Sequence, residues 1–171
     1  SIGTGVFEQA VNEPITVKKI FITGASSGLG AALATEFANE IIILGLLSRR
    51  VEVVQQVSKE FTGQVYCYGA DVGDSVKVRN AAESFMESVG VPDIVIANAG
   101  ISAGTDTSLV EDQVVFERIM RTNVLGIVHT FQPFLSAMSQ RGSGSLVGIS
   151  SIAGFRGIPG SGAYSASKAA A

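Results

Sequence analysis

The chain has 171 residues, of which 46% are hydrophobic and 16% charged, so it can form one domain with a buried core and does not have a disordered composition. Its net charge of −3, with acidic and basic residues interspersed, argues against a nucleic-acid partner, which would need a basic patch. No stretch approaches the roughly 20 apolar residues that span a bilayer, and no signal peptide is visible. The single cysteine, Cys67, excludes an intrachain disulfide and is compatible with a reducing compartment, so we expect a cytoplasmic location.

The first predicted elements are a strand, a glycine-rich turn and a helix. Residues 1–17 carry no strong pattern and are predicted to be an extension of a domain that spans 18–171. That domain opens with an apolar strand at about 19–23, and a helix follows at about 28–39. Between them the glycines follow a G-x-x-x-G-x-G spacing. Glycines let the backbone approach a phosphate, and free N–H groups at a helix start attract negative charge. The predicted cofactor-binding residues of this turn are Gly24, Ser26, Ser27, Gly28, Leu29 and Gly30. A tight turn without a ligand is the alternative interpretation.

The second predicted strand, at about 41–47, decides the expected cofactor. Dinucleotide-binding folds that begin with a strand, a glycine turn and a helix place an acidic residue near the end of the second strand when they bind the 2′-hydroxyl of an adenine ribose. Here the strand is followed by Ser48, Arg49 and Arg50. A hydroxyl and a rigid fork of charged donors suit a 2′-phosphate, so NADP(H) is favoured over NAD(H). Solvated arginines at the start of the next helix are the alternative.

The remaining elements continue the alternation of strands and helices. The strands are continuous apolar runs, as expected when helices cover both faces of a parallel sheet. With right-handed crossovers, this order predicts an α/β fold with a doubly wound, Rossmann-type parallel sheet and a ligand crevice at the carboxyl ends of its strands. The sequence ends within its last helix, so we expect C-terminal elements of this fold to be missing. The further strands are predicted at about 64–69, 93–97 and 145–150, and the further helices at about 50–60, 74–89, 111–139 and from 162.

Three residues near the end of the chain predict a proton-transfer site. Tyr164 and Lys168 are four residues apart and therefore share one face of a helix. An ammonium group fixed beside a phenol favours the phenolate. Ser151, 13 positions before the tyrosine, could hold a substrate oxygen against the phenol. Taken singly, each of the three residues is compatible with an ordinary surface position.

Together these motifs resemble the short-chain dehydrogenase/reductase family, and the resemblance covers roughly residues 18–171. Further matches are an acidic residue after the third strand, where the family has one near the adenine, an Asn-Ala-Gly turn after the fourth strand, and an asparagine in the long helix that matches the family's catalytic asparagine. These residues are Asp71 and Val72, then Asn98, Ala99 and Gly100, and finally Asn123. One departure is the missing glycine before the second strand, where we expect Asn39 to take the left-handed conformation instead.

The resemblance implies an oxidoreductase that transfers a hydride between NADP(H) and a small-molecule carbonyl or alcohol. In that role Tyr164 would be the general acid or base and would also contact the cofactor, and Lys168 would bind the nicotinamide ribose. Ser151 would orient the substrate oxygen, and Asn123 would shape a water relay to the lysine. The resemblance also implies a homodimer or homotetramer, because the long fourth helix and the tyrosine helix form the subunit contact in this family.

Two other functions stay open at this point. A catalytically silent nucleotide-binding or assembly module could be built on the same fold. A methyltransferase-type nucleotide fold would explain the glycine turn but not the tyrosine and lysine. No metal site is expected, because His129 is the only histidine and the sequence has no cysteine pair.

Overall fold

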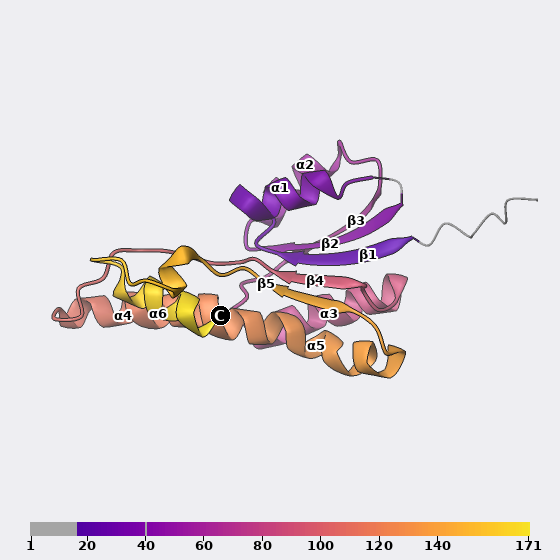
Figure 1. The fold of residues 1–171 in the computed structure, drawn as a ribbon. Coiled ribbons are helices and arrows are strands. Elements are labelled where there is room, and N and C mark those ends of the chain that lie inside the picture. Colours follow the sequence, from indigo (N-terminus) through magenta and orange to yellow (C-terminus); the bar gives the residue numbers. More distant parts are fainter. Residues whose placement is uncertain (1–16, 40) are drawn as a thin grey trace, which may run out of the picture.

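The computed structural model describes residues 17–39 and 41–171 (Figure 1). The predicted N-terminal extension therefore lies outside the described residues, apart from Val17. Five parallel strands form one sheet in the order β3-β2-β1-β4-β5, which confirms the predicted α/β fold with a doubly wound sheet. The direction of winding reverses between β1 and β4, and in such sheets the ligand crevice opens at that point. The strands are β1 (Lys18–Thr23), β2 (Ile42–Ser48), β3 (Gln64–Gly69), β4 (Ile94–Ala97) and β5 (Ser145–Gly148).

Helices cover both faces of the sheet. Figure 1 shows α1 (Gly28–Glu36) and α2 (Val51–Ser58) on one face, and α3 (Ser75–Val89) and α5 (Gly126–Arg141) on the other. Two further helices, α4 and α6, lie side by side beyond the carboxyl ends of the strands. Their bounds are Gln113–Met120 for α4 and Gly162–Ala170 for α6.

Alternate residues of the strands supply two separate cores. On the side of α3 and α5, Phe21 packs with Phe85 and Phe134 in a cluster of aromatic rings. On the side of α1 and α2, Ile20 and Leu44 pack in a second, aliphatic cluster. Both faces of each central strand are buried, which is the reason that the sequence shows continuous apolar runs instead of a polar–apolar alternation.

The long helix predicted at 111–139 is helical but is not one uniform α-helix. It begins with a 3₁₀ turn at Val110–Asp112 and continues as α4, a π-helical segment at Arg121–Leu125, and α5. The π-helical segment changes the phase of the helix between α4 and α5, and such segments occur often at functional sites. Asn123 lies inside it and is buried.

The expected left-handed conformation of Asn39 is wrong. None of the non-glycine residues that the structure describes has a positive φ. Instead, Asn39 Oδ1 accepts the backbone N–H of Ile41 at 3.2 Å, and the Asn39 carbonyl oxygen accepts the N–H of Ile42 at 3.2 Å. A side chain that bonds to the backbone two residues further on makes a turn without a left-handed residue.

Within residues 17–39 and 41–171, none of the helices combines the length and the apolar character that crossing a bilayer requires.

Candidate active site

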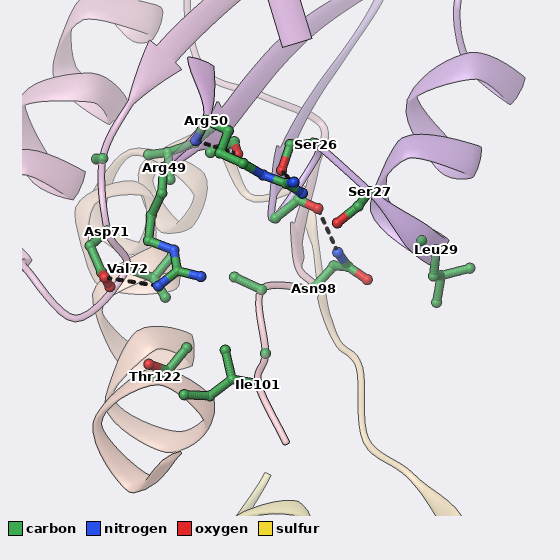
Figure 2. A pocket seen from close by; sticks show the side chains of 17 residues that line it. Ser26, Ser27, Leu29, Arg49, Arg50, Asp71, Val72, Asn98, Ile101 and Thr122 are labelled. Carbon is green, nitrogen blue, oxygen red and sulfur yellow. Dashed lines mark hydrogen bonds and ion pairs between the residues drawn. The ribbon is translucent and has the colours of Figure 1, made fainter. Parts of the chain in front are cut away.

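A cavity of about 350 Å³ lies at the carboxyl ends of the first four strands (Figure 2). It brings together every predicted cofactor residue except Gly30, Tyr164 and Lys168. Four further residues line it that were not predicted to bind the cofactor, namely Leu47, Ala70, Ile101 and Thr122. The lining residues are Gly24, Ser26, Ser27, Gly28, Leu29, Leu47, Ser48, Arg49, Arg50, Ala70, Asp71, Val72, Asn98, Ala99, Gly100, Ile101 and Thr122.

The glycine turn after β1 is fastened to the loop after β4. Asn98 Nδ2 donates to the carbonyl oxygens of Thr23 at 3.1 Å and Gly24 at 3.3 Å. Gly24 has φ +73°, and a Cβ there would lie 2.7 Å from Ala99 Cα, so this position requires glycine. Gly30 has a packing role, because a Cβ at this position would overlap the Gly24 carbonyl oxygen and the Asn98 amide.

The start of α1 suits a phosphate group. The helix begins at Gly28, and the Ser27 side chain does not cap it. The first backbone N–H groups of a helix have no acceptor within the helix, and the helix dipole favours an anion beside them. In the described part of the chain, no acidic side chain lies in the first turn of α1. These features fit the pyrophosphate of a dinucleotide.

Two arginines give the end of the cavity next to β2 a positive charge. Ser48 is buried, and its Oγ accepts the N–H of Arg50 at 3.1 Å. Arg50 Nη2 donates to Ser26 Oγ at 3.2 Å, so this guanidinium reaches across to the glycine turn (Figure 2). Arg49 Nη1 lies 3.8 Å from Asp71 Oδ2. The structure therefore places the serine and both arginines on the cavity wall.

The loop after β3 is held in place from two sides. Asp71 Oδ1 accepts the N–H of Gly73 at 2.8 Å, which closes a turn. His129 Nδ1 lies 2.8 Å from the Val72 carbonyl oxygen and is therefore the donor in this pair. The only histidine thus anchors a cavity loop to α5, and sequence spacing gave no sign of this contact.

Asn123 connects three segments of the chain. Its side chain is 1% exposed. Oδ1 accepts the N–H of Ile101 at 2.8 Å, and Nδ2 donates to the Ile101 carbonyl oxygen and to Ser167 Oγ, both at 2.9 Å. The π-helical segment, the loop after β4 and α6 are therefore joined through one amide group.

Lys168, on α6, reaches close to the cavity wall at Gly100. It is only 7% exposed, its Nζ donates to the Ile149 carbonyl oxygen at 2.7 Å, and Nζ lies 5.8 Å from the centre of the Tyr164 ring. A Cβ on Gly100 would come within 3.4 Å of Asn123 Oδ1 and 3.5 Å of Lys168 Nζ. Since Gly100 lines the cavity, both polar groups stand directly behind the cavity wall.

Ser151 and Tyr164 are on neighbouring elements but do not contact each other through a hydrogen bond. Ser151 Oγ accepts the N–H of Ala153 at 3.2 Å, and within the described residues the Tyr164 hydroxyl forms no hydrogen bond. The two elements are packed together, because Ser150 Oγ donates to the Lys168 carbonyl oxygen at 2.7 Å.

A short β-bridge connects the two loops near Tyr164. Thr105 pairs with Ser161, just before α6. The Thr105 N–H donates to the Gly160 carbonyl oxygen at 3.0 Å, and Thr105 Oγ1 accepts the N–H of Ala163 at 3.5 Å. The loop after β4 is therefore bonded to the start of α6.

The side chains that the structure describes include no group of three or more His, Cys, Asp and Glu residues that could hold a metal ion. The cavity itself combines the glycine turn, the two arginines and, behind Gly100, the amide of Asn123 and the ammonium group of Lys168.

Comparisons with known proteins find relatives over almost the whole chain. Residues 18–171 match the family model described as short chain dehydrogenase. A glycine betaine reductase of Emericella nidulans is 35% identical over 161 residues, which are 91% of this chain and 12% of that protein. An uncharacterized oxidoreductase of Mycobacterium tuberculosis is 36% identical over 164 residues, which are 91% of this chain and 63% of that protein. The chain therefore spans less than two thirds of the length of either relative.

Solved structures agree with this result. The alcohol dehydrogenase from the archaeon Thermococcus sibiricus, complexed with 5-hydroxy-NADP, superposes with a TM-score of 0.80 at 30% sequence identity. The superposition covers 90% of this chain and 66% of that structure.

Proposed function

Because this chain belongs to the short-chain dehydrogenase family, we propose that it is the cofactor-binding and catalytic part of an oxidoreductase that transfers a hydride between NADP(H) and a carbonyl or alcohol carbon. The observation that carries this proposal is the position of Gly100. This residue lines the cavity and has Asn123 and Lys168 directly behind it. A cofactor in the cavity would therefore lie next to the Lys168 ammonium group, and Tyr164 lies four residues before this lysine on the same helix.

Lys168 supports the proposal through its burial. A buried ammonium group is costly unless its donors are used. Among the described residues, the Ile149 carbonyl oxygen accepts one hydrogen bond from Nζ, which has three donors. The other donors are suited to the hydroxyls of a nicotinamide ribose.

The proposed mechanism divides the reaction between the cofactor and the chain. The bound nicotinamide would supply or accept the hydride. In reduction, Tyr164 would donate its hydroxyl proton to the carbonyl oxygen, and in oxidation the phenolate would take the alcohol proton. Ser151 would donate a hydrogen bond to the same substrate oxygen and so orient it. Lys168 would stabilise the phenolate electrostatically.

NADP(H) is the proposed cofactor because of the charge at the end of β2. Arg49 and Arg50 lie on the cavity wall beside the buried Ser48, where an acidic residue would favour a free 2′-hydroxyl. The related alcohol dehydrogenase was solved with an NADP derivative. A 2′-phosphate would be recognised here by two guanidinium groups, and the expected result is tighter binding of NADP+ than of NAD+ in a calorimetric titration.

The test of the catalytic proposal is the substitution Tyr164→Phe in the complete protein. We expect turnover of a ketone and alcohol panel, followed by nicotinamide absorbance, to fall about 10²- to 10⁴-fold, because general acid–base catalysis contributes that much. Affinity for NADP+ should stay within about twofold, since the phenol hydroxyl does not line the cavity.

Tyr66→Phe is the matched control, because the Tyr66 hydroxyl contacts Gln64 on β3 instead. Undiminished turnover of the Tyr164→Phe variant would contradict the mechanism. Binding of NADP+ by the unaltered protein, without turnover of any substrate in the panel, would favour a silent nucleotide-binding module.

Self-association and location stay predictions. Self-association is supported by apolar side chains that α4 and α5 leave exposed, with Val114 at 72%, Val128 at 52% and Leu135 at 47%. Phe134 and Ile119, from the same predicted helix, are instead fully buried in the core. We therefore propose a homodimer or homotetramer, and a cytoplasmic location stays a prediction from the sequence.

A further inference from the structure

The two adjacent arginines at the cavity wall have partners of different charge. Arg50 donates to a neutral hydroxyl, Ser26 Oγ, at 3.2 Å. Arg49 faces a carboxylate instead, with Nη1 and Asp71 Oδ2 3.8 Å apart (Figure 2). A hydroxyl does not compete with a phosphate for a guanidinium, whereas a carboxylate does, because both anions need the same forked donors.

The geometry of the Arg49–Asp71 pair allows an exchange of partners. The two side chains are 64% and 48% exposed, and ion pairs of this kind contribute little to stability. Both residues line the cavity, so an anion that enters it reaches the same guanidinium. The carboxylate would then stand close to the incoming phosphate and repel it.

On the premise that the cavity holds the proposed dinucleotide, we infer that Asp71 limits the discrimination between NADP(H) and NAD(H), because its carboxylate competes with the 2′-phosphate for Arg49. Asp71 is thus a specificity-determining residue that acts against the preference created by the two arginines. The acidic side chain reduces the selectivity of the site for the phosphorylated cofactor.

The substitution Asp71→Asn isolates the charge. Asparagine keeps an oxygen that can accept the Gly73 N–H, which Asp71 Oδ1 accepts at 2.8 Å, so the turn after β3 is retained. NADP+ and NAD+ share the adenine and the pyrophosphate. Any change in those shared contacts therefore cancels in the ratio of their dissociation constants, and the 2′-phosphate contribution remains.

Asp74→Asn is the matched control. Asp74 also forms an exposed 3.8 Å ion pair, with Lys77, and caps α3 through the Lys77 N–H, a role that asparagine fills equally well. It removes the same charge three positions further along the chain, and Asp74 does not line the cavity.

The experiment is calorimetric titration of the complete protein with NADP+ and NAD+ at low ionic strength, repeated at about 1 M salt, where screening is strong. We expect Asp71→Asn to raise the ratio Kd(NAD+)/Kd(NADP+) about three- to fivefold through tighter NADP+ binding. The gain should shrink at high salt and in an Arg49→Gln background, and Asp74→Asn should leave the ratio unchanged.

An unchanged or lower ratio in Asp71→Asn would overturn the inference. So would an equal rise in Asp74→Asn, since net charge would then explain it, or an undiminished rise without Arg49, since the pair would then play no part. Failure of the unaltered protein to prefer NADP+ at all would instead contradict the proposed cofactor.

Discussion

Two buried polar groups, the Asn123 amide and the Tyr68 hydroxyl, differ in whether they have hydrogen-bond partners. The Asn123 amide oxygen accepts a hydrogen bond from the Ile101 N–H, and its Nδ2 donates to the Ile101 carbonyl oxygen and to Ser167 Oγ. The Tyr68 hydroxyl, on β3, is buried and forms no hydrogen bond of normal geometry within the described residues. A buried polar group without a partner lowers stability, so the two residues contribute to stability with opposite sign.

Tyr68→Phe is therefore expected to raise the free energy of unfolding by about 1 kcal/mol near pH 7. The measurement is urea denaturation, with Tyr66→Phe as the control, because the Tyr66 hydroxyl has Gln64 as a partner and its loss should give no gain. A Tyr68→Phe variant that is clearly less stable than the unaltered protein would show that the hydroxyl has a partner in solution.

The same residue predicts a change at alkaline pH. Burial raises the pKa of the Tyr68 phenol, and the nearby Ser84 hydroxyl offsets only part of this rise. The unfolded chain then loses the phenol proton at a lower pH than the folded protein does. This titration therefore leaves the free energy of unfolding unchanged below about pH 10 and lowers it as the pH rises through the folded pKa. Stability measured above pH 10 should therefore fall less steeply in Tyr68→Phe.

At the scale of elements, β2 depends on a glycine for packing. A Cβ on Gly45 would lie 2.5 Å from Phe21 Cδ2 and 2.7 Å from Phe85 Cδ2, inside the aromatic core between the sheet and α3. Gly45→Ala is expected to lower the free energy of unfolding by about 1–3 kcal/mol, because the added methyl group would overpack this core.

Gly148→Ala is the matched control for this prediction. Gly148 is also a strand glycine, on β5, but no heavy atom lies within 4 Å of its added Cβ. Gly148→Ala should raise the free energy of unfolding slightly, by less than about 1 kcal/mol. Equal effects of the two substitutions, measured by thermal unfolding, would contradict the packing argument.

The elements differ in how well the sequence predicts them. The strands were predictable to within a residue or two, because each is a short apolar run bounded by polar or glycine residues. The π-helical segment at Arg121–Leu125 was not, since apolar spacing alone does not distinguish an α-helix from one with an extra residue in a turn. Asn39 was predicted wrongly because its side chain satisfies the turn without a positive φ.

Some parts of the candidate site could likewise be predicted from the sequence, and others could not. The glycine turn and the residues Ser48 to Arg50 were predictable, because they follow strand ends directly in the sequence. The contacts of His129 with Val72 and of Ser167 with Asn123 were not, since each joins residues more than 40 positions apart. Such long-range pairs depend on how the helices pack, which no local pattern specifies.

At the scale of the whole molecule, the end of the sheet opposite the cavity is held together by Arg141. Its guanidinium donates to the carbonyl oxygens of Val91, Pro92 and Ser143 and pairs with Asp93 at 3.4 Å. Asp93 also accepts the N–H of Lys19 at 2.8 Å. One side chain at the end of α5 therefore joins the starts of β1, β4 and β5.

Arg141→Ala should lower the free energy of unfolding by about 2–4 kcal/mol, since several hydrogen bonds to a charged group are lost together. Affinity for NADP+ in the folded protein should remain within about twofold, because Arg141 lies at the amino ends of the strands. Chemical denaturation and calorimetric titration measure the two quantities. Arg79→Ala, at an exposed position on α3, is the control.

The bridge between Thr105 and Ser161 has a consequence for protein engineering. The segment that precedes the phenol by three positions is bonded to the loop after β4, so the two cannot be redesigned independently. A substitution at Thr105 that breaks these contacts would therefore be expected to shift the start of α6 and, with it, the proposed proton donor Tyr164. The outer part of that loop, at 106–109, can be varied with less effect on the direction of the phenol.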